Sequence, residues 1–349
     1  MIDILITEDS DVVAALLRGI FQAEPDMRVV GRARDGREAV TLAHELKPDL
    51  VTMDIRMPVM DGFEATRMIM ATQPLPIVVI SSSVDDEELR ITFRAIEEGA
   101  LAVIEKPRGL SHPDFERIRR DLVETVRAMA EVKVVRRRHP RPNMAVFQAP
   151  PPAPRRAGGG REVVGLALST GGPQALSTLL AGMPVGYPLP LLVVQHISPG
   201  FVGGMVNWLR GQTLLEVCLA TTNQPLQAGT VYIAPDAHHL EVARRDGRLH
   251  TRLSSEPPVD RFRPSATALF HSLARCCGAG AIGGIFTGMG SDGSDGLVAL
   301  HRAGGHVFAQ DEESSVVYGM PGAARAAGCV DQVVPLARIP IHLIELARS

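Results

Sequence analysis

Residues 163–176 read VVGLALSTGGPQAL, an apolar run followed by a serine, a threonine, two glycines, a proline and a second apolar stretch. The first run predicts a buried strand, and Pro173 predicts the first turn of a helix, because proline is tolerated where a helix begins. Ser169 then lies at the junction of strand and helix, where Gly171 and Gly172 would let a substrate approach the backbone. A strand followed directly by a helix is the repeating unit of a parallel α/β sheet.

The same alternation of strand and helix extends in both directions from this stretch. It runs from residue 1 to about 130 and resumes at Arg161, so we expect two doubly wound parallel sheets. The predicted strands are Ile2–Thr7, Arg28–Arg32, Leu50–Asp54, Ile77–Ser81, Leu101–Ile104, Val163–Leu168, Leu191–Gln195, Thr230–Ile233, Ala281–Phe286 and His306–Ala309. The predicted helices are Asp11–Gln22, Arg37–Leu46, Phe63–Ala71, Asp86–Glu97, Pro173–Ala181, Phe201–Leu209, Ser265–Ala274, Leu297–Ala303 and Ala323–Ala327.

Between the two regions the composition changes to proline, arginine and glycine. Residues 132–160 read VKVVRRRHPRPNMAVFQAPPPAPRRAGGG, which excludes regular packed structure. We therefore predict three parts: a domain at 1–130, a linker at 131–160 and a domain at 161–349. The RRR run could instead be a small nucleic-acid patch, but a solvated connector fits the composition better.

Bulk composition limits the function classes. The formal net charge of −3 gives no overall basic field, so we expect no nucleic-acid partner. The opening MIDILITEDSD lacks the basic start and cleavage site of a signal peptide. No apolar run reaches the length of a membrane helix, so we expect a cytoplasmic protein without membrane insertion.

Polar side chains gather where the predicted strands of the first domain end. Glu8 and Asp9 follow the first strand, Asp54 ends the third, Ser81 ends the fourth and Lys106 follows the fifth. Parallel sheets bind ligands at this edge. Clustered carboxylates repel one another unless a cation lies between them, and Mg²⁺ needs only one or two while keeping its waters. The pattern predicts a Mg²⁺ site with an aspartate that can attack a phosphoryl group.

This first domain resembles the response-regulator receiver family over roughly residues 1–125. The matching motifs are EDS at 8–10, MDIRMPVMDG at 53–62, Ser81 and EKP at 105–107. The resemblance implies a flavodoxin-like fold and phosphorylation of Asp54 by a histidine kinase. It also implies Mg²⁺ held by Glu8, Asp9 and Asp54, and a phosphoryl group sensed by Ser81 and Lys106. Where many receivers have an aromatic switch residue, this chain has Val103.

The second domain also has a candidate nucleophile, base and acid, and each of them follows a predicted strand. The run LPLLVVQH ends in His196, at the carboxyl edge of a predicted strand. This is the position expected of a general base that serves Ser169. A glycine-rich loop after another strand carries Asp292 and Asp295, either of which could orient His196. Spacing alone does not choose between them, and Ser169 or Thr170 could also be a simple helix cap or part of a phosphate loop.

A dinucleotide site is the main competitor. Gly288–Gly293 matches G-x-G-x-x-G after a strand and before a helix, with Asp311 about twenty residues further on. That reading leaves Ser169 and His196 unexplained, and it places acidic residues where a pyrophosphate would bind. A nicotinamide-dependent oxidoreductase and a non-catalytic response regulator therefore remain as alternatives.

The second domain resembles the protein-glutamate methylesterases of bacterial chemotaxis over roughly residues 161–346. The motifs are LALSTGGPQAL, VVQHISPGF, GTVYIAPDAHHL, RFRPSATALF, FTGMGSDGSDG and AQDEESSVVYGMP. The resemblance implies a Rossmann-like domain in which Ser169 is the nucleophile, His196 the base and Asp292 the orienting acid, while Asp295 is structural. It implies oxyanion support near Ser169, from Thr170, Gly171 and the Met289 N–H. The implied substrates are glutamate methyl esters, and also glutamines, on methyl-accepting chemoreceptors, with no cofactor for the esterase chemistry.

Overall fold

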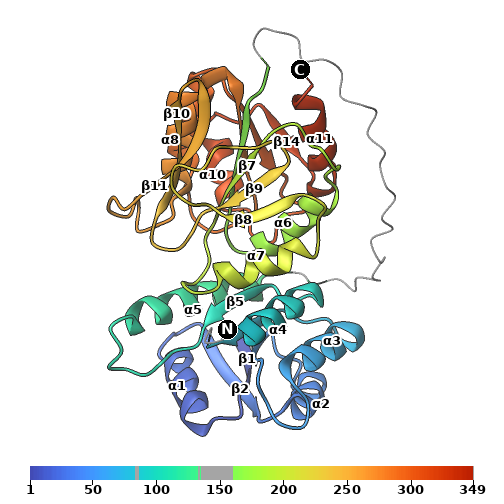
Figure 1. Cartoon of the computed structure of the whole chain (residues 1–349). Coiled ribbons are helices and arrows are strands. Elements are labelled where there is room, and N and C mark those ends of the chain that lie inside the picture. Colours follow the sequence, from blue (N-terminus) through green and yellow to red (C-terminus); the bar gives the residue numbers. More distant parts are fainter. Residues whose placement is uncertain (83–85, 133, 135–159, 349) are drawn as a thin grey trace. The chain divides into compact units, whose positions relative to one another are not determined.

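The computed structural model describes residues 1–82, 86–132, 134 and 160–348, without the side chains of residues 86–91 (Figure 1). These residues form two compact units, one containing the elements before the predicted linker and the other most of those after it. The predicted linker itself falls almost wholly outside the described residues. Within the described residues, no helix has the length and apolar character needed to cross a membrane.

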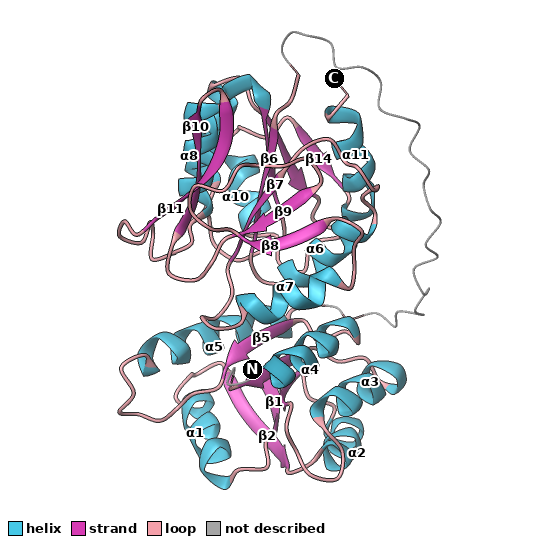
Figure 2. Cartoon of the chain, viewed as in Figure 1, coloured by secondary structure: helices cyan, strands magenta, loops and turns pink. Residues whose placement is uncertain are grey.

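The first unit is a five-stranded parallel sheet with helices on both faces (Figure 2). The strand order is β2-β1-β3-β4-β5, so the chain reverses direction across the sheet between β1 and β3. Its strands are β1 (Ile2–Thr7), β2 (Met27–Ala33), β3 (Leu50–Asp54), β4 (Ile77–Ser81) and β5 (Ala102–Glu105). Its helices are α1 (Asp11–Gln22), α2 (Gly36–Leu46), α3 (Gly62–Thr72), α4 (Asp86–Glu97) and α5 (Phe115–Ala130).

The second unit is built on a seven-stranded parallel sheet in the order β14-β13-β12-β6-β7-β9-β8. Its strands are β6 (Val163–Leu168), β7 (Leu191–Gln195), β8 (Glu216–Leu219), β9 (Thr230–Ile233), β12 (Ala281–Ile285), β13 (His306–Gln310) and β14 (Gln332–Val334). Its α-helices are α6 (Gly172–Ala181), α8 (Ala266–Cys276), α9 (Ser294–Arg302), α10 (Met320–Ala326) and α11 (Ile339–Leu346), and α7 (Val202–Arg210) is divided between the two units. A separate antiparallel pair, β10 (His239–Arg245) and β11 (Arg248–Ser254), packs beside α8.

The prediction of two doubly wound parallel sheets is confirmed. The strands predicted around Ser169 and His196, Val163–Leu168 and Leu191–Gln195, match β6 and β7 to the residue. Both are completely buried, which explains their unbroken apolar character. The sequence did not lead us to β8, β14, the β10–β11 pair or α11, and we gave no bounds for α5.

The order of the second sheet decides where a site can form. After β6 the chain continues through β7 to one edge of the sheet, and it later returns on the other side of β6 with β12. The reversal therefore lies between β6 and β12, and ligands bind at such points outside the carboxyl ends of the strands. The segments that follow β6, β7 and β12 are those that carry Ser169, His196 and Asp292.

Candidate functional site

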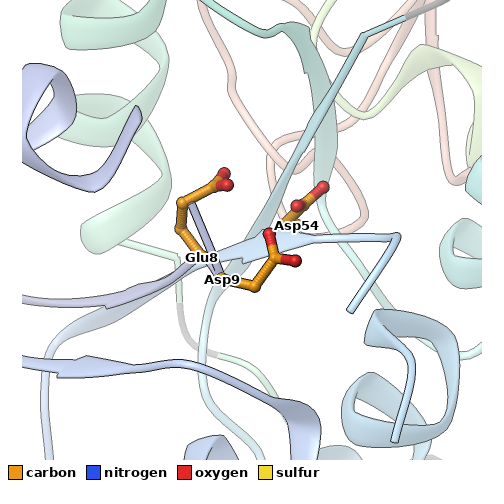
Figure 3. A group of neighbouring side chains, drawn as sticks. All are labelled: Glu8, Asp9 and Asp54. Carbon is orange, nitrogen blue, oxygen red and sulfur yellow. The ribbon is translucent and has the colours of Figure 1, made fainter. Parts of the chain in front are cut away.

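The first unit gathers three acidic side chains at the carboxyl edge of its sheet. Glu8 and Asp9 follow β1 and Asp54 ends β3, and one carboxylate oxygen of each lies within 4.8 Å of the others (Figure 3). Glu8 and Asp54 are buried, whereas Asp9 is exposed. This donor set has the oxygen chemistry and the spacing that fit a hard divalent cation such as Mg²⁺.

Lys106 brings a positive charge to the same edge from the end of β5. Its Nζ lies 3.0 Å from Glu8 Oε2 and 2.8 Å from Asp54 Oδ2. Burial alone would lower the pKa of Lys106, but the two carboxylates outweigh burial and raise that pKa. Burial raises the pKa of Glu8 and of Asp54, and Lys106 offsets only part of the effect. A bound cation would therefore stabilise the charged forms of both acids.

Ser81 completes the predicted set at the end of β4. It is fully buried, and Thr92 Oγ1 on α4 lies 3.2 Å from Ser81 Oγ. Val103 lies opposite Val79 in the register of β5 and β4. Thr92 did not stand out in the sequence, because its position beside Ser81 depends on how α4 packs on the sheet.

The turn after β6 holds Ser169 where the sequence predicted it. Ser169 N donates to Thr287 O at 3.1 Å, which ties the turn to the end of β12. Gly171 has φ +76°, a left-handed backbone conformation that favours glycine, and a Cβ there would lie 2.6 Å from Val316 Cβ. A Cβ on Gly288 would likewise lie 2.6 Å from Ser169 Cβ. The glycines thus let three chain segments meet around the Ser169 side chain.

His196 and Asp292 form a buried pair beside this turn. His196 N donates to Leu168 O at 2.9 Å, which continues the β6–β7 register and puts Ser169 and His196 next to each other. His196 Nε2 lies 2.9 Å from Asp292 Oδ2, and the Asp292 side chain is completely buried. The sheet therefore brings together a hydroxyl, an imidazole and a carboxylate from well-separated parts of the chain.

The start of α8 keeps the buried Asp292 ionised. Asp292 accepts hydrogen bonds from Ser265 Oγ at 2.8 Å, Ala266 N at 2.7 Å and Thr267 N at 3.1 Å. Burial by itself would raise the pKa of Asp292, but His196 and these donors outweigh burial and lower that pKa to about 2. The N-terminus of a helix favours a negative charge because its first backbone N–H groups are free to donate and the helix dipole is positive there.

The two aspartates of the glycine-rich loop lie in different surroundings. Asp292 is buried against His196, whereas Asp295 is exposed in the first turn of α9. The geometry therefore joins only Asp292 to the imidazole.

Hydrogen-bond donors stand open beside Ser169. The backbone N–H groups of Thr170, Gly171 and Met289 donate to no acceptor among the described residues. Thr170 is nonetheless fixed, because its carbonyl accepts from Thr287 Oγ1 at 2.9 Å. Unused N–H groups at the start of a helix and in a glycine loop are suited to binding a developing oxyanion.

Ser169 and His196 directly follow the paired strands β6 and β7, and among the described residues there is no hydrogen bond between Ser169 Oγ and the imidazole. Nε2 of His196 is taken by Asp292, while Nδ1 is buried and has no partner in the described part of the chain. Nδ1 is therefore the nitrogen left to act on Ser169. Hydrogen bonds of catalytic groups are often long before substrate binds and shorten in the complex.

The glycine-rich loop is not shaped for a dinucleotide. Gly288 N donates to Val317 O, and Gly288 O accepts from Gly319 N and Met320 N, so this backbone is already engaged. Asp311, the acidic residue about twenty positions after the G-x-G-x-x-G pattern, accepts from Ser314 N in its own loop. These contacts leave the nucleotide-binding reading unsupported.

Two further side chains contact the site and were not singled out from the sequence. Gln195 Nε2 donates to the carbonyl oxygens of Ser169 and His196, each at 2.8 Å. Phe262 stacks on the His196 ring. Gln195 adjoins His196 in the sequence and could have been noticed, but the contact of Phe262 depends on the path of a distant loop.

Comparisons with known proteins agree with this geometry. The family model described as CheB methylesterase matches residues 164–343, and the response regulator receiver domain model matches residues 4–112. A protein-glutamate methylesterase/protein-glutamine glutaminase of Myxococcus xanthus is 49% identical over 99% of this chain and 97% of its own length. One of the same name from Geobacter metallireducens is 44% identical over 99% of each chain. The crystal structure of the Thermotoga maritima CheB methylesterase catalytic domain is 34% identical, with a TM-score of 0.52, and covers 53% of this chain and 98% of its own.

Proposed function

The chain belongs to the CheB methylesterase family and carries a receiver domain, and we propose that it is a phosphorylation-regulated protein-glutamate methylesterase and protein-glutamine deamidase. Its substrates would be glutamate γ-methyl esters and glutamine side chains on methyl-accepting chemoreceptors. The observation that carries the proposal is the buried His196–Asp292 pair beside Ser169 at the reversal point of the sheet. The nucleotide-dependent and the non-catalytic alternatives have no comparable support.

In the proposed acylation, Ser169 Oγ attacks the ester carbonyl carbon. His196 Nδ1 accepts the hydroxyl proton, and Asp292 stabilises the resulting imidazolium through Nε2. When the bond to the methoxy group breaks, the imidazolium returns that proton and methanol leaves. Usually it is Nε2 that faces the serine and Nδ1 that faces the acid; here the two ring nitrogens exchange these roles.

Water then attacks the acyl-enzyme and His196 again acts as the base, so the products are a glutamate side chain and free Ser169. A glutamine substrate would follow the same route with ammonia as the leaving group. Both reactions pass through a tetrahedral oxyanion, which the N–H groups of Thr170, Gly171 and Met289 are placed to stabilise.

Control of the rate is assigned to the first domain. We propose that Asp54 accepts a phosphoryl group from a histidine kinase, and that Ser81 and Lys106 contact its oxygens. Glu8, Asp9 and Asp54 would hold Mg²⁺, which when bound neutralises charge on the phosphoryl oxygens. Residues 1–130 and 161–349 are the proposed domains, joined by residues 131–160, and the protein would act in the cytoplasm without membrane insertion or nucleic acid.

Methanol release from methylated receptor tests the catalytic proposal. We expect Ser169→Ala and His196→Ala to abolish release while the circular dichroism spectrum of each variant stays near that of the wild type. Ser177→Ala, a change of the same kind further along α6, is the control and should keep the activity. Continued hydrolysis by the Ser169 or the His196 variant would refute the assigned chemistry.

A further inference from the structure

Phe262 lies flat against the His196 ring. The two ring centroids are 4.2 Å apart, and the planes differ by only 7°. Phe262 comes from the segment between β11 and α8, far from β7 in the sequence. The imidazole is therefore held at one edge by Asp292 and on one face by Phe262. With the hydrogen bond to Nε2 alone, the ring could still tilt about that bond.

A tight turn fixes the position of Phe262. Val259 N donates to Phe262 O at 3.1 Å, and Phe262 N donates to Val259 O at 2.8 Å. The two residues between them, Asp260 at φ +44° and Arg261 at φ +70°, are both left-handed. Two consecutive left-handed residues that are not glycine are costly and persist only where the surrounding structure imposes them.

His239 anchors the loop that carries this turn at both ends. Ser265 N donates to His239 Nδ1 at 3.2 Å, and His239 Nε2 lies 3.1 Å from Pro257 O. Because Nδ1 accepts, the proton is on Nε2, which donates to the Pro257 carbonyl. His239 is almost completely buried. One imidazole thus clamps the loop from Pro257 to Ser265, and Ser265 in turn donates to Asp292.

We propose that Phe262 is a positioning residue for the hydrolytic reaction: it keeps the His196 imidazole in the plane where Nε2 reaches Asp292 and Nδ1 stays available to Ser169. The inference rests on the proposed function. The phenyl face also attracts a positive charge. When His196 takes up the serine proton it becomes an imidazolium, so this attraction favours the transition state and acts on kcat more than on KM.

The test compares Phe262→Leu and Phe262→Tyr with the wild-type full chain in methanol release from methylated receptor. Leucine removes the ring, and we expect kcat to fall about three- to tenfold with KM nearly unchanged. Tyrosine keeps the ring and should restore most of kcat. Asp260→Asn is the matched control in the same turn, because asparagine tolerates left-handed backbone and this position does not touch His196.

Proton NMR of the His196 ring tests the stacking itself in solution, while the split between kcat and KM and the rescue by tyrosine test the positioning role. The ring current of Phe262 should shift the His196 ring resonances, and this shift should disappear in Phe262→Leu and persist in Phe262→Tyr. Phe262→Met serves as a second ring-free variant if the leucine variant does not fold.

The inference is overturned if a folded ring-free variant keeps kcat within twofold of the wild type, or if Phe262→Tyr loses as much kcat as Phe262→Leu. Failure of the proposed function is a separate result, since the wild type itself would then release no methanol.

Discussion

Asp292 is the residue on which the electrostatics of the proposed catalytic site depend. It is buried among three donors from the start of α8, and its fourth contact is His196 Nε2. An ionised carboxylate in this position fixes the proton of a neutral His196 on Nε2, so that Nδ1 carries the free lone pair. The acid therefore selects which ring nitrogen can serve as the base.

Replacing Asp292 by asparagine should lower the rate steeply while leaving the size of the side chain unchanged. An amide nitrogen facing His196 would favour the opposite tautomer, with the proton on Nδ1, where it cannot accept from Ser169. We expect kcat for methanol release to fall roughly 10⁴-fold, the scale seen when the acid of a Ser-His-Asp site becomes an amide. Asp295→Asn, an exposed change three residues on, is the control and should stay within about twofold.

The same carboxylate should make stability depend on pH. The pKa of Asp292 is about 2 in the folded protein and near its ordinary value of 3.8 when unfolded. As pH falls, the unfolded chain therefore binds the proton first. The contribution, about 2 kcal/mol, is fully present well above pH 4 and is lost as pH falls toward 2.

Urea unfolding of the wild type and of Asp292→Asn from pH 7 to pH 3 measures this contribution. The gap in unfolding free energy between the two proteins should shrink by about half of that amount at pH 3. A gap that is constant over the whole range would show that Asp292 does not carry the pH dependence.

At the scale of single residues, the sequence predicts most of the site. Ser169, His196 and Asp292 each follow a strand, and strand ends can be recognised from apolar runs. The choice between Asp292 and Asp295 cannot be made in this way, because both lie in one glycine-rich loop and only burial separates them. The nitrogen of His196 that faces Asp292 also depends on the final packing of the ring.

The turn from β6 into α6 is the element that positions Ser169, the proposed nucleophile. Gly171 combines a left-handed backbone with close contact to Val316, so two independent constraints exclude a side chain. The turn also holds Thr170, whose carbonyl is bound by Thr287. A change at Gly171 would therefore displace the open N–H groups together with Ser169.

Gly171→Ala should reduce both stability and activity. The left-handed conformation costs alanine about 1 kcal/mol, and the contact with Val316 adds to this cost. We expect unfolding to be easier by about 2–4 kcal/mol and kcat to fall at least tenfold. Gly186→Ala is the matched control, because Gly186 has the same φ of +76° and its Cβ would meet no described atom within 4 Å. Equal losses in both variants would show that the Val316 contact is unimportant.

The antiparallel pair β10–β11 is an example of the elements that we did not predict from the sequence. Asp246 and Gly247, both left-handed, form its turn, and an Asp-Gly pair between alternating runs is a recognisable hairpin signal. The runs on either side contain arginine, histidine and threonine rather than unbroken apolar residues, because the pair is only partly buried and some of its buried positions are polar. A search for buried parallel strands passes over such elements, yet β10 begins at His239, the anchor of the Phe262 loop.

At the scale of the whole molecule, two unlike chemistries share one chain. The first unit places three carboxylates and one ammonium at the edge of its sheet, and the second places a Ser-His-Asp set at the edge of another. Both sites follow from the same rule, that the carboxyl ends of parallel strands meet at one edge. The sequence predicts both sheets, whereas communication between the sites depends on contacts that strand and helix patterns do not specify.

A phosphoryl donor should raise the esterase rate of the full chain, and Mg²⁺ should be required for that rise. Glu8 and Asp54 are buried with raised pKa values and share Lys106 as their cation, so adding a phosphoryl group without a second cation would place further negative charge among them. With acetyl phosphate and Mg²⁺ we expect methanol release to increase roughly fivefold or more, the usual scale of coupling between two sites. EDTA, or Asp54→Asn, should remove the increase, and inorganic phosphate in place of acetyl phosphate should produce none. The chelator should leave the rate without donor unchanged, because the chemistry proposed for Ser169, His196 and Asp292 uses no metal. A chelator-sensitive basal rate would contradict this separation of the two sites.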